Sequence, residues 1–193
     1  MALAAFIAAC ALLLGFFVWE RGSRQSAEAK SFVRGSFDRG STVLLASVFS
    51  LGFLLLPLSL VLNALGIARM NFPPAVAWVG IVVMTLGIAL RIWASRALGR
   101  YFTRTLRVAP DQAVVSDGPY RFVRHPGYLG DILLWSGAAF ATLNWITFVG
   151  LMLVALLSYS YRIQVEEVML QEILGAPYRA YMARTWRLLP FLY

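Results

Sequence analysis

Four long apolar runs dominate the pattern of the chain, at residues 2–19, 41–68, 75–98 and 132–161. A helix needs about 20 apolar residues to cross the hydrocarbon core of a bilayer. Each of the first three runs has about that length or more, so each predicts one transmembrane helix. Polar, mostly basic segments separate the runs, as expected of the connections between membrane helices.

The fourth run is too long for one ordinary span and too short for two full ones. The segment "TLNW", residues 142–145, interrupts it near its middle. The run therefore predicts a helical hairpin with helices at 128–143 and 145–162. The tail, residues 163–193, is amphipathic: Gly175 is typical of a helix end, and Pro177 suits the first turn of another short helix.

These elements predict an all-α integral membrane protein. It has about five transmembrane helices, of which the last two form the hairpin, and a short C-terminal amphipathic helix. The chain is expected to be a single membrane domain, residues 1–193, in which residues 1–98 supply three N-terminal helices. Residues 99–193 hold the candidate functional core.

Composition and charge agree with a membrane protein. Hydrophobic residues make up 60% of the 193 residues and the mean hydropathy is +0.73, whereas soluble domains are about 45–50% apolar. The net charge is +8, but the basic residues flank apolar runs, where they set membrane topology. Nucleic acid is therefore not an expected partner; membrane lipids are.

The distribution of basic residues predicts the orientation. Loops 20–40 and 99–127 and the tail are rich in arginine, so the positive-inside rule places them in the cytoplasm and the N-terminus outside. The basic residues follow the first run rather than precede it, which favours a retained helix over a signal peptide. Arg91 and Arg96 are expected to extend toward the cytoplasmic interface.

Candidate chemistry gathers in the second half of the chain. His125 is the one histidine, in "RFVRHPGYLG", and Arg162 and Glu166 share a helical face four residues apart. The hairpin brings these residues and Tyr128 to the same leaflet. Taken singly, each has a simpler explanation as an interfacial, packing or solvated residue. Together they predict a pocket for a polar zwitterionic ligand with a lipid acceptor on its bilayer side.

Several other kinds of site are not indicated. The chain has no evident serine–histidine–acid set and no glycine-rich phosphate loop. One histidine and one cysteine are poor material for a metal site, so no metal ligands are predicted.

The segments "GPYRFVRHPGY" and "EEVMLQEILGAPYRAYMARTWRLLP" resemble the isoprenylcysteine carboxyl methyltransferase family and the related phospholipid methyltransferases. The similarity covers roughly residues 99–193, and "DRGS" at 38–41 looks like prokaryotic members. The resemblance implies an S-adenosylmethionine-dependent methyltransferase in a prokaryotic inner or plasma membrane, with its active site toward the cytoplasm. It implies cofactor binding by Arg107, Gln112, Ala113, Val114, Val115, Tyr120, His125, Pro126, Gly127, Tyr128 and Glu166.

For the acceptor, the resemblance implies that Arg162 holds the substrate carboxylate, with Glu166 and Arg184 as further catalytic candidates. An ionised carboxylate needs no general base, and a guanidinium can hold it through two parallel hydrogen bonds. His125 is then expected to contribute mainly geometry. The alternatives are methyl transfer to a phospholipid or other amine, an NADPH-dependent membrane reductase, and a membrane protein without catalytic activity.

Overall fold

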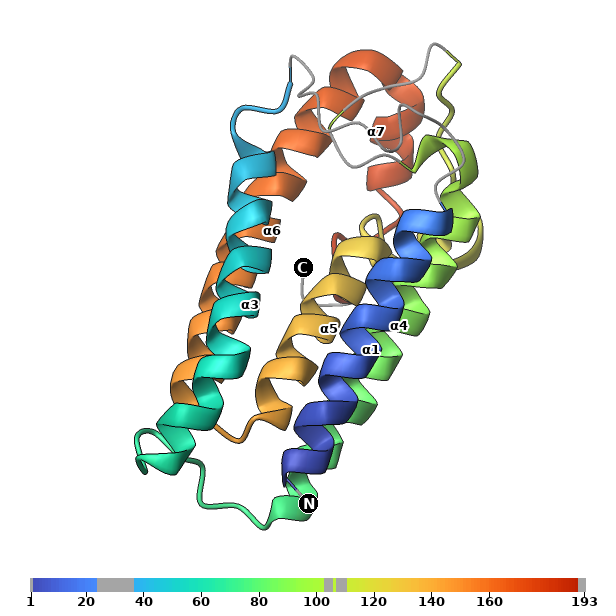
Figure 1. The fold of residues 1–193 in the computed structure, drawn as a ribbon. Helices are drawn as coiled ribbons and strands as arrows, with labels where there is room; N and C mark the ends of the chain where they lie inside the picture. The colour runs from blue at the N-terminus through green and yellow to red at the C-terminus, as the bar shows by residue number, and fades with distance from the viewer. Residues whose placement is uncertain (1, 24–36, 103–105, 107–110, 191–193) are drawn as a thin grey trace.

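Five long helices run side by side along a common axis (Figure 1). The computed structural model describes residues 2–23, 37–102, 106 and 111–190. The long helices are α1 (Ala2–Ser23), α3 (Ser41–Ala64), α4 (Ala77–Leu98), α5 (Pro126–Ala141) and α6 (Trp145–Leu174). The short ones are η1 (Pro74–Val76), η2 (Gly99–Tyr101), η3 (Gly118–Arg121) and α7 (Ala176–Met182). Over the part of the chain described, regular structure is helical apart from two isolated bridges, so the all-α prediction is confirmed.

Four of the helical segments are long and apolar enough to cross a membrane: Ala2–Gly22, Ser41–Ala64, Pro74–Tyr101 and Trp145–Leu174. Helix α5 has 16 residues, which makes it about 24 Å long, short of the roughly 30 Å hydrocarbon core. The first helix of the predicted hairpin is thus present in the bundle but is shorter than an ordinary span.

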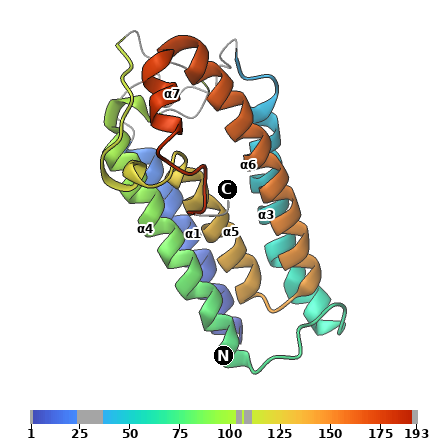
Figure 2. The same ribbon diagram turned by 180° about the vertical axis from the view of Figure 1, so that it is seen from behind.

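The ends of the helices divide the molecule into two poles. Helices α3 and α5 begin, and α1, α4 and α6 end, at the pole that carries α7, as Figures 1 and 2 show from opposite sides. The first described residues and the turn between α5 and α6 lie at the other pole. The described ends of the basic connections 20–40 and 99–127 therefore lie at one pole, as the predicted grouping requires.

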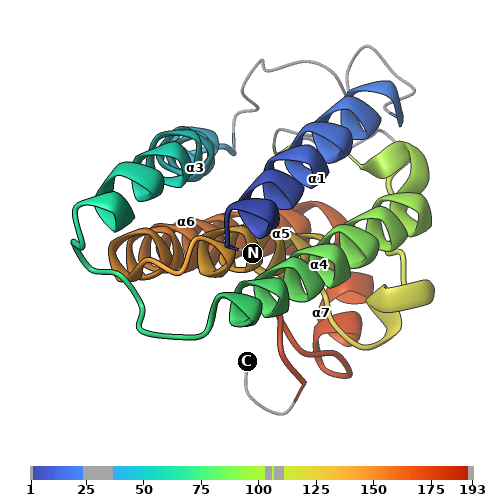
Figure 3. The same cartoon turned by 60° about the horizontal axis from the view of Figure 1, so that its bottom comes forward.

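Helix α5 lies at the centre of the bundle, beside α1, α4 and α6 (Figure 3). Its closest neighbour is α4, and glycines make this approach possible. A Cβ at Gly87 would lie 2.5 Å from the backbone nitrogen of Leu134 and 2.6 Å from the carbonyl oxygen of Gly130. Small residues let helix backbones approach closely in membranes, and here they fix α5 against α4.

An aromatic cluster fills the space between α5, α1 and α3. Trp135 is buried at its centre. The rings of Phe17, Phe49 and Phe53 surround it, with centroids 5.6–6.4 Å from its own. Such tilted and edge-to-face pairs stabilise more than their buried area alone.

The hairpin turn occurs where "TLNW" predicts it. Asn144 caps α6, because its side-chain oxygen accepts a hydrogen bond from the Thr147 amide at 3.3 Å. Its amide nitrogen donates to Asn63 at 2.9 Å and to the carbonyl of Ile67 at 3.0 Å, which ties the turn to the end of α3. The second helix does not stop at residue 162, where the predicted hairpin ends, but continues to Leu174, and Gly175 ends it as predicted.

Candidate functional site

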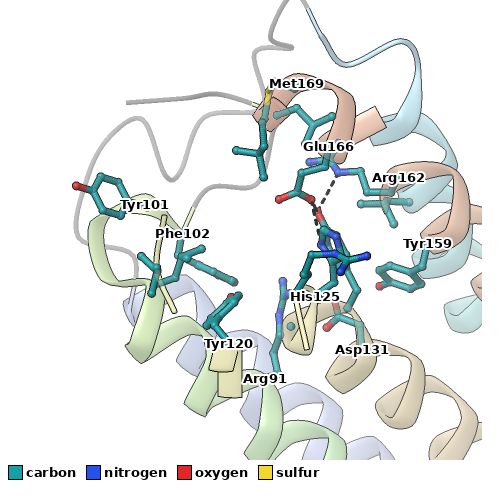
Figure 4. A pocket seen from close by; sticks show the side chains of 18 of the residues that line it. Arg91, Tyr101, Phe102, Tyr120, His125, Asp131, Tyr159, Arg162, Glu166 and Met169 are labelled. Atoms are coloured by element: carbon teal, nitrogen blue, oxygen red, sulfur yellow. Dashed lines mark hydrogen bonds and ion pairs between the residues drawn. The ribbon is translucent and has the colours of Figure 1, made fainter. Parts of the chain in front are cut away.

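One cavity of about 480 Å³ lies at the pole of the bundle that carries α7, with walls from α1, α3, α4, α5, α6 and α7 (Figure 4). Most of the residues singled out in the sequence line it, although they come from three separate segments of the chain. They are Gln112, Ala113, Val114, Val115, Tyr120, His125, Gly127, Tyr128, Arg162 and Glu166.

Two of the predicted residues, Pro126 and Arg184, do not line it. Pro126 is buried at the first turn of α5, behind the wall. Arg184 does not line the cavity; it borders a smaller one of about 260 Å³, with Ser116, Arg121 and Thr185. Tyr181 lines both cavities. Arg107 lies outside the described residues.

The hydroxyl of Tyr128 joins the two predicted residues of α6. It donates to Glu166 at 2.5 Å and accepts from Nε of Arg162 at 3.2 Å. The ring of Tyr128 stacks on that of His125, with 5.6 Å between centroids and 10° between planes. The predicted common face of Arg162 and Glu166 is therefore organised around a side chain of α5.

Arg162 is buried and also bound to the segment that leads into α3. Its Nη1 donates to Asp38 at 3.1 Å, to Ser41 at 2.7 Å and to Thr42 at 3.2 Å. Burial alone would raise the pKa of Asp38, but hydrogen bonds from Thr42 and Ser41 and the charge of Arg162 outweigh it, so this pKa is lowered. An ionised Asp38 thus holds Arg162 at the cavity wall.

Glu167, the neighbour of Glu166, makes a second buried charge cluster behind the wall. One carboxylate oxygen, Oε1, accepts from Nε of Arg124 at 2.8 Å and lies 3.3 Å from Nε2 of His125. The other, Oε2, accepts from Nε of Arg187 at 2.9 Å. Arg124, expected to act as a topology residue, is instead part of this cluster and also donates to the carbonyls of Met182 and Thr185.

Backbone hydrogen bonds join the C-terminal segment to the start of α5. The amides of Arg124 and His125 donate to the carbonyls of Trp186 and Arg187, at 2.7 and 3.1 Å. The amide of Trp186 donates in turn to the carbonyl of Phe122 at 3.1 Å. The "RHPGY" segment is consequently held by residues some sixty positions further along the chain.

Arg91 supplies a third charged group that the sequence did not reveal. It does not extend to an interface as expected but is buried, with Nη2 3.4 Å from Glu20 and Nη1 3.2 Å from Asp131. Its guanidinium lies over the ring of Phe102, 4.8 Å from the centroid. All four residues line the cavity; the one available signal was a carboxylate, Asp131, directly before the fourth apolar run.

Tyrosines of α7 close the cavity. Tyr178 and Tyr181 lie three residues apart on α7, and both are buried. Burial raises the pKa of Tyr181 to about 12, and burial together with the nearby Glu166 and Glu167 raises that of Tyr178. Both hydroxyls stay protonated at neutral pH, and that of Tyr181 donates to the carbonyl of Tyr120 at 2.7 Å.

The bilayer side of the cavity is apolar. Phe17 of α1 and Leu45, Ala46 and Phe49 of α3 form this part of the wall. A single space therefore joins a polar end, near Glu166, to a hydrocarbon-lined end between helices.

Comparison with known proteins identifies the arrangement. The model of the isoprenylcysteine carboxyl methyltransferase family matches residues 78–172, which include Arg91, His125, Tyr128, Arg162 and Glu166. The matched segment is about half of the chain. The match confirms the resemblance seen in the two motifs.

Curated relatives of the family match much of the same region. A protein of Oryza sativa subsp. indica described as "Probable protein-S-isoprenylcysteine O-methyltransferase" is 33% identical over 120 residues, which are 61% of this chain and 62% of the relative. The protein-S-isoprenylcysteine O-methyltransferase B of Arabidopsis thaliana is 31% identical over 116 residues, 58% of each chain. The present chain thus spans about three-fifths of the length of these methyltransferases.

The fold extends the likeness to the N-terminal helices. A solved structure of the eukaryotic intramembrane Ras methyltransferase of this family superposes with a TM-score of 0.69 at 22% sequence identity. The superposition covers 98% of this chain and 66% of the solved one. The helical arrangement of the family is therefore present in this shorter chain.

Proposed function

We propose that this member of the isoprenylcysteine carboxyl methyltransferase family binds S-adenosylmethionine at the polar end of the cavity and transfers its methyl group to a lipophilic acceptor. The observation that carries the proposal is the single cavity that joins the residues of the family motifs to an apolar wall between α1 and α3. Neither end alone would distinguish a methyltransferase from a nucleoside-binding or lipid-binding protein.

The residues of the polar end suit this cofactor. A cavity of about 480 Å³ is within the range of small-molecule sites. Aromatic faces of Tyr101, Phe102 and Tyr120 line it and can stack on a purine. The carboxylates of Glu166 and Asp131 line it too, and they favour a ligand with an ammonium and a sulfonium group. When bound, the cofactor supplies an electrophilic methyl group.

The chain has mainly to position the reactants and exclude water. Tyr128 fixes Glu166 and Arg162 relative to each other. Arg162 orients an acceptor carboxylate, while Asp38, Ser41 and Thr42 hold its Nη1 side in place. Because a carboxylate is ionised at neutral pH, no residue needs to remove a proton from it.

The most direct substrate class is an isoprenylated cysteine with a free carboxylate, after the activity that names the relatives. An amine is the second candidate, because Nη1 of Arg162 already faces Asp38 and because Glu166 and Asp131 add carboxylates to the cavity. An amine must lose a proton before it attacks, and Glu166 is then the group placed to accept it.

Product analysis distinguishes these two acceptor classes. Purified protein is incubated with S-adenosylmethionine labelled at its methyl group and with either an isoprenylated cysteine or an aminophospholipid. We expect the label in a methyl ester of the isoprenylated cysteine, from which mild base releases it. A base-stable N-methyl product that forms only from the phospholipid would instead make the amine the acceptor. An isoprenylated cysteine whose carboxylate is already esterified is the matched control.

A failure of S-adenosylhomocysteine to bind would contradict the proposal at its root. Binding of NADPH instead would favour a reductase, and binding of neither would favour a protein without this catalytic activity. Equilibrium binding of S-adenosylhomocysteine and of NADPH to the detergent-solubilised protein distinguishes these outcomes.

We also propose that the pole with the cavity faces the cytoplasm. The helix ends that flank the arginine-rich connections lie at this pole, which supports the orientation through the positive-inside rule. In a Cys10→Ser background, a cysteine replacing exposed Arg179 should be protected from an impermeant thiol reagent in intact cells. A cysteine replacing exposed Arg69, at the opposite pole, should be labelled; the reverse pattern would invert the topology.

A further inference from the structure

A second cavity, of about 260 Å³, lies beside the first at the pole that carries α7. Its described lining residues are Ser116, Arg121, Tyr181, Arg184 and Thr185, and none of them is acidic. Ser116 precedes η3 and Arg121 ends it, whereas the other three belong to α7 and the residues directly after it. Small-molecule sites usually measure about 300–1,000 Å³, so this cavity suits a small polar group rather than a whole cofactor.

Hydrogen bonds hold the two sides of the second cavity in fixed positions. The hydroxyl of Tyr181 donates to the carbonyl of Tyr120 at 2.7 Å, and that of Thr185 donates to the carbonyl of Tyr181 at 2.7 Å. The amide of Trp186 donates to the carbonyl of Phe122 at 3.1 Å. The cavity is therefore preorganised, which lowers the cost of binding a ligand there.

The groups that remain for a ligand carry positive charge. The hydroxyls of Tyr181 and Thr185 already donate within the protein. Arg121 and Arg184 are exposed, and neither forms an ion pair with another described residue. The guanidinium of Arg121 lies over the ring of Phe122, 5.0 Å from the centroid, a contact that leaves the N–H groups at its edge available to donate. Guanidinium groups bind phosphate through pairs of parallel hydrogen bonds, so the cavity favours a phosphate group.

Exposed apolar side chains border the charged ones. Phe122 is 51% exposed, Trp186 37% and Leu189 44%, and the first two directly follow Arg121 and Thr185 in the chain. The segment after α7 runs back from that helix along the bundle (Figure 2). Aromatic side chains gather at the headgroup level of a bilayer. A phosphate at this level belongs to a lipid, whereas a soluble phosphate would gain nothing from an apolar border.

We infer that the second cavity binds the phosphate of an anionic membrane phospholipid, with Arg121 and Arg184 as the cationic contacts. Phe122 and Trp186 then lie against the glycerol and the upper part of the acyl chains. An anionic headgroup is favoured because the same guanidinium groups repel the ammonium of a zwitterionic lipid. Arg184, for which the family resemblance implies a catalytic role, is thereby assigned to a separate lipid site. The inference involves no cofactor or methyl acceptor, so it does not depend on the proposed function.

Native mass spectrometry of the detergent-solubilised protein tests this site, because it counts bound lipid molecules. Phosphatidylglycerol and phosphatidylcholine with identical acyl chains are added separately, without S-adenosylmethionine. We expect one molecule of phosphatidylglycerol to bind at concentrations at which phosphatidylcholine does not. Equal binding of the two lipids would overturn the inference, since the guanidinium groups would then not select the headgroup charge.

Substitution of each arginine locates the bound lipid. We expect Arg121→Gln and Arg184→Gln each to weaken phosphatidylglycerol binding tenfold or more, the effect of one hydrogen bond between charged groups. Both side chains are exposed, and the unfolding temperature shows whether the variants keep their fold. Arg179→Gln is the matched control, because Arg179 is exposed on α7 and does not line the cavity. It changes the net charge equally and should bind as the wild type does; equal weakening in all three variants would mean diffuse attraction to a basic pole.

Two further results would overturn the inference. If inorganic phosphate displaces phosphatidylglycerol at concentrations similar to those of the lipid, the cavity is a site for a soluble anion. If Arg184→Gln binds phosphatidylglycerol normally but no longer supports methyl transfer, Arg184 has the catalytic role instead. Loss of lipid binding in this variant, with inorganic phosphate unable to compete, supports the lipid site even if the protein transfers no methyl group.

Discussion

Replacement of Arg162 by lysine should weaken the contacts that connect α6 with α5 and with the segment before α3. The guanidinium bonds Asp38, Ser41 and Thr42 through Nη1 and Tyr128 through Nε. The planar guanidinium can bond the partners of Nη1 and of Nε at the same time, whereas a lysine ammonium can reach only one of these two sets. Arginine-to-lysine at this position is therefore not a conservative change.

The magnitude follows from the bonds lost. A hydrogen bond to a charged group contributes about 1.5–3 kcal/mol, and Arg162→Lys loses at least one of them. We expect a loss of about 2–3 kcal/mol in the free energy of unfolding, or about 5–10 °C in the unfolding temperature of a chain of this size. Arg162→Met removes the buried charge from its partner and should cost about 3–5 kcal/mol.

Thermal unfolding in detergent at one scan rate measures these differences. Arg179→Lys is the matched control, because Arg179 is exposed on α7 and its replacement should change stability by less than about 0.5 kcal/mol. A double-mutant cycle with Asp38→Asn then isolates the ion pair, with an expected coupling of about 1–3 kcal/mol. Strictly additive effects of the two substitutions would refute the reasoning, since the contact could not then join the two elements.

Three further predictions concern other contacts that hold the bundle together. Gly87→Ala should destabilise the protein by about 1–3 kcal/mol because its Cβ would meet the backbone of α5, whereas Gly15→Ala, with nothing within 4 Å, should be neutral or slightly stabilising; equal effects in thermal unfolding would contradict the close approach. The lowered pKa of Asp38 means that its contribution is present above its ordinary pKa and is lost as the pH falls through the lowered one. The unfolding temperatures of wild type and Asp38→Asn should therefore converge below about pH 4, and a constant difference down to pH 3 would exclude this linkage. Asn144→Ala should cost about 2–3 kcal/mol by removing the cap of α6 and its bonds to α3, and it should raise hydrogen exchange at the hairpin turn first; uniform exchange along α6 would argue against a local role.

Much of the fold was predictable because local signals decide it. The length of the apolar runs gave α1, α3 and α4, and "TLNW" marked the hairpin turn because Asn144 serves as a cap. Gly175 marked the end of α6, whereas the apolar run already ends near residue 162, because the last turns of the helix contain Glu166 and Glu167. Their charges are satisfied by other segments, so the helix continues where hydropathy alone would end it.

The sequence predicted which motifs contribute to the site, but not which charged side chains pair with one another. Residues of both motifs, among them His125, Tyr128 and Glu166, line one cavity. The pairing of Arg162 with Asp38, and of Arg91 with Glu20 and Asp131, joins positions 40 to 124 residues apart. No local pattern encodes such pairs, because they depend on how far each helix is rotated and shifted against its neighbours. The sequence therefore suggested interfacial arginines where the fold has buried ion pairs.

The backbone bonds between residues 122–125 and 186–187 have a consequence for biosynthesis. Helix α5 follows α4 along the chain and enters the bundle before its starting residue has any of these partners. The segment that completes that start is translated only after the whole of α6 and α7. The polar end of the cavity consequently cannot form while the ribosome is still making α6, so a nascent chain should become able to bind its ligand only when residue 187 has left the exit tunnel.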